Sequence, residues 1–107
     1  MMNQLCLIGR LASDPIITEN ENGIKTTEIT MVIPRSFKNK DGEYDNDFIN
    51  CVVFNGIDSS MLEKGMLLGI KGRLSSTKDK DAGTLQMKVL AEKLTLLSTR
   101  QKTEMER

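Results

Sequence analysis

The sequence contains no histidine, no tryptophan and only two cysteines. Without histidine, the chain lacks the commonest general base and the commonest ligand of transition metals. The cysteines, Cys6 and Cys51, each lie inside an apolar run, where a thiol behaves as a small hydrophobic side chain. We therefore expect no zinc site, no disulfide and no cofactor, and the sequence offers no motif for an enzyme.

The chain also has no net charge, because its 15 Lys and Arg residues balance its 15 Asp and Glu residues. The whole molecule therefore exerts no general attraction on nucleic acid, and any such binding requires a local basic patch. No apolar run approaches the length of a membrane span, and no basic N-terminal segment leads into a cleavable apolar stretch. A chain of 107 residues suits one domain. We expect a cytoplasmic protein with no membrane partner.

Alternating apolar and polar residues predict an all-β fold. The predicted strands are residues 4–11, 24–33, 47–54, 66–74 and 85–97. Residues 57–64 are predicted to form a short helix, with Asp58 or Ser59 as its N-cap and Gly65 at its end. Three strands, a short helix and two further strands are the order of a five-stranded Greek-key barrel of the OB-fold type.

The boundaries of this domain follow from the same pattern. Pro34 is expected to end the second strand because proline cannot donate a backbone hydrogen bond. Residues 34–46 are then a long polar loop, and residues 75–84 a second loop. We expect the OB-fold domain to comprise residues 1–97 and residues 98–107 to form a charged, disordered tail.

The third predicted strand, residues 47–54, carries two aromatic rings on one face. Side chains alternate along a strand, so Phe48 and Phe54 share a face with Asn50 and Val52. The opposite face is wholly apolar, as a core side is. Two spaced rings suit the stacking of unpaired bases, although they also suit the two ends of a core.

A basic segment with one aromatic residue precedes this strand. Phe37 lies among three cations, Arg35, Lys38 and Lys40. Cations attract phosphates, and an unstacked base can lie on the ring. Other candidates for phosphate contact are more scattered: Arg10, Lys71, Arg73 and Lys88.

Several motifs together resemble the bacterial single-stranded DNA-binding proteins of the SSB family. They occur in family order between residue 3 and about residue 97, and the segment 47–54 is the most specific. The matching segments are 3–11 with Asp14 and Pro15, 36–39, 47–54, 64–65 and 72–74.

The resemblance implies an OB-fold that binds unpaired DNA in replication, recombination or repair, with little sequence preference, and that assembles as a homotetramer, with a dimer as the alternative. Phe37, Phe48 and Phe54 would occupy the stacking positions. Asn3 and Leu5 would lie near the dimer contact. A bacterial, nucleoid-associated location is implied as well.

The chain also departs from the family pattern. The last hairpin, at 77–81, has no aromatic residue, and phenylalanine is a smaller platform than the indole common at the first two positions. Residues 102–107 lack the family's acidic tip with a terminal phenylalanine. We therefore do not expect recruitment of other proteins through a tail.

Two other functions remain as alternatives. One is an OB-fold adaptor similar to primosomal replication protein B, which acts mainly through replication-protein partners. The other is a metal-dependent enzyme, for which the sequence offers only spread carboxylates in a polar segment: Asp41, Glu43, Asp45 and Asp47.

Overall fold

The computed structural model describes residues 1–54 and 60–98, which form six strands. These are β1 (Leu5–Leu11), β2 (Ile16–Glu19), β3 (Lys25–Lys38), β4 (Tyr44–Phe54), β5 (Leu67–Lys78) and β6 (Leu85–Ser98). No described segment is a helix, so none is long and apolar enough to cross a membrane.

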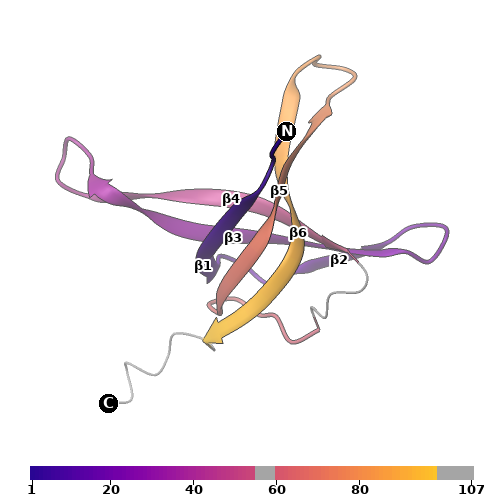
Figure 1. The fold of residues 1–107 in the computed structure, drawn as a ribbon, viewed down its shortest axis with the longest axis horizontal. Helices are drawn as coiled ribbons and strands as arrows, with labels where there is room; N and C mark the ends of the chain where they lie inside the picture. Colours follow the sequence, from indigo (N-terminus) through magenta and orange to yellow (C-terminus); the bar gives the residue numbers. More distant parts are fainter. Residues whose placement is uncertain (55–59, 99–107) are drawn as a thin grey trace.

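Five of the strands close into a barrel (Figure 1). β1 pairs with β5 on one side and with β3 on the other, and β4 pairs with β3. β6 lies between β5 and β4, antiparallel to β5 and parallel to β4. The ring β1–β5–β6–β4–β3 is therefore complete, and the predicted OB-type barrel is confirmed. β2 adds to the N-terminal part of β3, outside the ring.

The core consists of aliphatic and sulfur-containing side chains that point inward from the barrel strands and from Met66, which immediately precedes β5. It contains Leu11, Ile29, Met31, Cys51, Val53, Met66, Leu68, Ile70, Val89 and Ala91. Burial raises the pKa of the Cys51 thiol to about 11, so this cysteine stays protonated at neutral pH. Cys6 is exposed on β1, and neither cysteine forms a disulfide.

The prediction of a loop at 34–46 is wrong, because Pro34 does not end its strand. β3 runs on to Lys38, and Pro34 faces Asn46 in the ladder with β4. The register shifts between Pro34 and Lys38, and this irregularity tolerates a residue without an N–H group. Asn39 closes the turn, since its Oδ1 accepts hydrogen bonds from the backbone of Asp41 and Glu43.

The expected loop at 75–84 is also shorter than predicted. β5 and β6 continue as a hairpin to Lys78 and Leu85, and Asp79 accepts backbone hydrogen bonds in the turn. Figure 1 shows both long hairpins, with the β2–β3 hairpin, projecting from the barrel as three arms. The sequence pattern did not indicate β2, whose four residues are all exposed.

The helix predicted at 57–64 is not found in its described part. Residues 60–64 are turn and irregular structure, and 57–59, with both candidate N-caps, lie outside the described residues. Gly65 does have a φ of 92°, and its N–H donates to the carbonyl of Leu11. Of the predicted tail, only Ser98 is described, and it is the last residue of β6. Residues 99–107 lie outside the described residues.

Candidate nucleic-acid interface

Every aromatic residue of the chain lies on the β3–β4 hairpin and is exposed. The sequence has three phenylalanines, one tyrosine and no tryptophan, so the core contains no aromatic ring. The exposed fractions are 70% for Phe37, 56% for Tyr44, 66% for Phe48 and 45% for Phe54. Rings normally contribute strongly to a core when they are buried, so four exposed rings on one hairpin form an unusual surface.

Strand pairing arranges the outer face between Phe48 and Phe54. Val32 faces Phe48 across the β3–β4 ladder, and Thr26 faces Phe54. Between these two pairs, the Thr30 hydroxyl donates to Oδ1 of Asn50 at 3.1 Å. Ile49, Cys51 and Val53 point into the core, as the alternation of the strand predicted. The rings are therefore on the solvent side of the barrel, with a polar pair between them.

Phe37 and Tyr44 are the two exposed rings of the projecting part of this hairpin. The ammonium group of Lys38 lies 5.8 Å from the centre of the Tyr44 ring, a cation–π distance. Sequence reasoning missed Tyr44 because it fell inside the segment expected to be a loop. Its position two residues after the Asp-Gly turn was the available signal.

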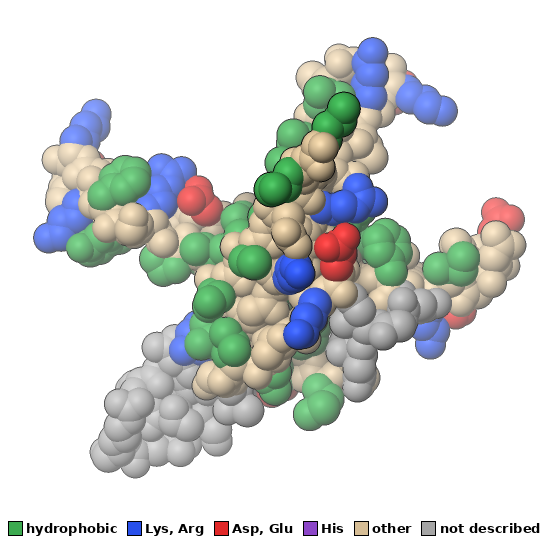
Figure 2. All heavy atoms as spheres, in the orientation of Figure 1, with side chains coloured by type: hydrophobic (Ala, Val, Ile, Leu, Met, Phe, Trp, Pro, Cys, Tyr) green, Lys and Arg blue, Asp and Glu red, His purple; other side chains and the backbone are tan. Residues whose placement is uncertain are grey.

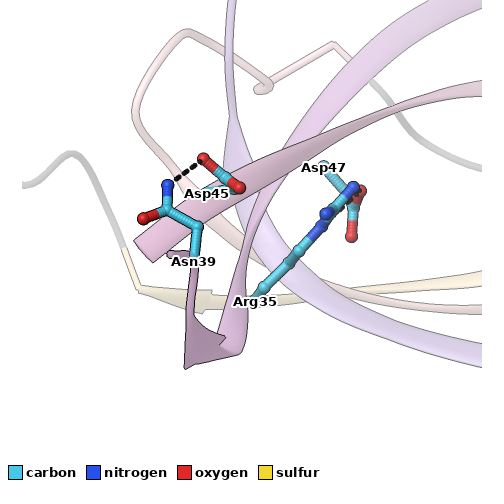
Figure 3. Close-up of polar contacts among 4 residues, drawn as sticks. All are labelled: Arg35, Asn39, Asp45 and Asp47. Atoms are coloured by element: carbon cyan, nitrogen blue, oxygen red, sulfur yellow. Dashed lines mark hydrogen bonds and ion pairs between the residues drawn. The ribbon is translucent and has the colours of Figure 1, made fainter. Parts of the chain in front are cut away.

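Arg35, a predicted phosphate contact, is held by a carboxylate of the same hairpin (Figure 3). Its Nη2 lies 2.9 Å from Oδ1 of Asp47, and its Nε donates to the same oxygen at 3.2 Å. The hydrogen bond and the charge of Asp47 raise the pKa of Arg35. Asp47 precedes Phe48, and neighbours along a strand point to opposite faces. The Arg35–Asp47 ion pair therefore lies on the face of the hairpin opposite the Phe48 ring.

Two further predicted cations also have partners within the chain. Lys88 on β6 donates to Glu28 on β3 at 3.1 Å, beside the Thr30–Asn50 pair. Arg10 lies opposite Val32, but its Nη1 donates to the carbonyl of Gly65 at 2.8 Å.

The remaining predicted cations divide between two surfaces. Lys38 and Lys40 are exposed near the end of the β3–β4 arm, with Phe37. Lys71 and Arg73 are exposed on β5, which β6 separates from β4 in the sheet. The structure therefore brings Lys38, Lys40 and Lys88 near the rings. It holds Arg35 on the face of the hairpin opposite Phe48, and it places Lys71 and Arg73 on a different part of the barrel.

The carboxylates of the enzyme alternative serve the hairpin itself. Asp45 accepts a hydrogen bond from the Asn39 amide at 3.1 Å (Figure 3), and Asp47 holds Arg35. In the part of the chain that the structure describes, no three or more Asp, Glu, His or Cys side chains form a group that could hold a metal ion.

A closed five-stranded barrel with exposed rings on one hairpin is typical of OB-fold modules that bind nucleic acid. Comparison with known proteins makes the class definite. The sequence matches the Single-strand binding protein family over residues 2–97, and the chain belongs to this family.

Curated relatives agree with this assignment. A single-stranded DNA-binding protein of Bacillus cereus is 39% identical over 79 residues, which are 71% of this chain and 46% of that protein. Single-stranded DNA-binding protein 1 of Staphylococcus aureus is 40% identical over 79 residues, which are 71% of this chain and 47% of that protein. The chain thus spans about half the length of the curated relatives it matches.

Solved structures show the same fold. The wild-type single-stranded DNA-binding protein of Thermus aquaticus superposes with a TM-score of 0.79 at 21% identity, over 91% of this chain and 50% of that one. A Plasmodium falciparum SSB in complex with ssDNA gives a TM-score of 0.74 at 20% identity, over 92% of this chain and 96% of that one.

Proposed function

We propose that this protein binds single-stranded DNA with little sequence preference, without catalysis, and protects it during replication, recombination or repair. The observation that carries the proposal is the exposure of all four aromatic rings on the β3–β4 hairpin. Bases would stack on Phe37, Phe48 and Phe54, and any base offers a π-face, so stacking tolerates any sequence. Membership of the family supports this function over the adaptor alternative.

The backbone of the DNA would follow the cations on and beside the hairpin. Lys38 and Lys40 on the arm, together with Arg35 and Lys88, are the nearest candidates for phosphate contact. Arg10, Lys71 and Arg73 would contact phosphates only if the DNA strand continued around the barrel. Because two of the nearer cations already face carboxylates, we expect a shallower salt dependence than the number of cations implies.

Titration of the protein with oligo-dT at two salt concentrations tests this function. We expect saturable binding that weakens as salt rises, because each phosphate contact releases counterions. A duplex of the same length is the control, and we expect it to bind much more weakly since its bases are not free to stack. Preference for the duplex would contradict the proposal.

Replacing Glu28 with glutamine should strengthen DNA binding. The ion pair with Lys88 is partly exposed, with side-chain exposures of 38% for Lys88 and 45% for Glu28, and such pairs contribute only about 0–1 kcal/mol. Without the carboxylate, the ammonium becomes available to a phosphate. We expect the slope of log K against log salt to steepen by about 0.7, the value for one additional contact on a single strand.

Glu21→Gln is the matched control for this change. Glu21 lies in the turn between β2 and β3, so the variant removes the same charge far from Lys88 in sequence and in a different arm. Equal effects of the two variants on the slope would show that net charge, and not the ion pair, sets the affinity.

We propose in addition that the protein assembles as a homotetramer, with a dimer as the alternative. The outer face of β1, β5 and β6 supports self-association, because Ile8 and Leu97 are 62% and 48% exposed and line one shallow groove. Asn3, expected near the dimer contact, ties the start of the chain to β5 through two hydrogen bonds with the backbone of Leu74. Light scattering with and without oligo-dT would report both the assembly state and the DNA stoichiometry.

The domain division and the location belong to the same proposal. Residues 1–97 would form the DNA-binding domain and residues 98–107 a charged tail. The protein would act in the cytoplasm, at the nucleoid of a bacterium, with single-stranded DNA and its own copies as partners.

A further inference from the structure

A cavity lies where β4 and β6 separate from one another. The two strands pair in parallel over only three positions, from Cys51 opposite Val89 to Val53 opposite Ala91. On the N-terminal side of this contact, β4 belongs to one projecting arm and β6 to another (Figure 1). The separation leaves an opening of about 310 Å³, and core side chains, among them Leu7 and Val89, line its inner part.

Two side chains from different arms line this cavity. Phe48 comes from β4, and Met87 comes from β6 with an exposed fraction of 57%. Leu74 of β5 lies on the same side as Met87 and is 40% exposed. Figure 2 shows hydrophobic side chains along the upper arm, the β5–β6 hairpin, where no aromatic residue occurs.

Polar groups complete the lining. Asn50 and Lys88 both contribute to the cavity. The Lys88 ammonium is fixed by Glu28, and the Asn50 amide is fixed by the Thr30 hydroxyl. An amide carries both donors and an acceptor, so it can bond to the edge of any base, while the ammonium suits a base carbonyl or a phosphate.

We propose that this cavity binds one unpaired base of the DNA, inserted between the Phe48 ring and the Met87 thioether. This inference rests on the function proposed above and assigns to Met87 a role in that site. A polarisable sulfur makes favourable contacts with π-systems, so methionine can take a position where a ring would otherwise stack. Continuity with the aromatic hairpin favours a nucleotide over an apolar peptide, and so do Lys88 and Asn50. Each makes one hydrogen bond within the chain and has further donors, which a base or phosphate can use and an apolar side chain cannot.

Substitution of Met87 in the 107-residue chain tests the inference with oligo-dT as the probe. We expect Met87→Ala to weaken binding about two- to tenfold, the range of a sulfur–aromatic contact, with an unchanged melting temperature since the side chain is largely exposed. Met87→Trp should bind at least as tightly as the unsubstituted protein. It would introduce the chain's only tryptophan, and we expect its fluorescence to be quenched on saturation with oligo-dT.

Met61 provides the matched control. It is 68% exposed, precedes β5 and does not line the cavity. We expect Met61→Ala to leave the affinity unchanged and the fluorescence of Met61→Trp to be insensitive to oligo-dT.

The outcomes separate this inference from the function on which it rests. If the unsubstituted protein does not bind oligo-dT, both fail. If it binds, but Met87→Ala has no effect and the tryptophan at 87 is not quenched, the function stands and the base pocket is overturned.

Discussion

Replacing both Phe48 and Phe54 with alanine should lower the affinity for oligo-dT by about two to four orders of magnitude. Stacking contributes roughly 1–3 kcal/mol per base, which is about one to two decades for each ring. The rings are 66% and 45% exposed, so their removal takes little from the core. We therefore expect the melting temperature to change by only a few degrees, and a fluorescence-anisotropy titration would measure the loss of binding.

Ile17→Ala is a suitable control for the aromatic pair. Ile17 is a 58% exposed apolar residue on β2, outside the aromatic hairpin. We expect its replacement to leave oligo-dT binding unchanged. If the double phenylalanine variant folds and binds as well as the control, the rings are not the DNA platform, and the adaptor alternative becomes the better explanation.

Replacing Gly72 with alanine should cost about 3 kcal/mol of unfolding free energy or more. A Cβ atom at this position would lie 2.1 Å from the carbonyl oxygen of Leu90 and 3.2 Å from Cα of Ala91, and both are backbone atoms. Overpacking of a core usually costs about 1–3 kcal/mol, and a clash with backbone belongs at or above the upper end because no side chain can rotate away. The loss would be a large part of the roughly 5–15 kcal/mol that stabilises a typical domain.

The reason for this glycine lies in the register of β5 and β6. Lys71 faces Lys93, while Gly72 faces Ala91, so Glu92 is an extra residue on β6. Such a bulge brings the two backbones close and bends the strand pair. Gly69→Ala is the matched control, since a Cβ there would lie 3.6 Å from its nearest neighbour, the Cδ1 of Leu97. Urea unfolding followed by circular dichroism compares the variants, and equal midpoints would contradict the prediction.

The sequence predicted the barrel strands because each has one buried face. On β4, Ile49 lies between the exposed Phe48 and Asn50, and on β5 the buried Leu68 and Ile70 alternate with the less buried Gly69 and Lys71. Beyond the barrel, neither face of a hairpin arm is buried, so the alternation ends although the strands continue. The whole of β2 was missed for this reason. The extension of β3 was missed because Pro34 was expected to end the strand, whereas the irregularity in the ladder accommodates it.

The candidate site was predictable at the level of residue types but not of contacts. Phe48 and Phe54 were found from alternation within one strand. The pairing of Lys88 with Glu28 joins residues 60 positions apart, and sequence pattern carries no sign of it. The role proposed for Met87 depends on the separation of β4 from β6, which follows from the closure of the barrel rather than from any local motif.

The short parallel contact between β4 and β6 has a consequence for how the protein folds. The β3–β4 and β5–β6 ladders join segments that adjoin in the chain, so each hairpin can zip up from its own turn. The parallel contact joins residues 51–53 to residues 89–91, and a long loop must close before its few hydrogen bonds form. Pairings between distant segments slow folding, so we expect closure of the barrel at this contact to limit the folding rate. Until then, the edges of β4 and β6 stay unpaired, and two chains that fold side by side could exchange hairpins there.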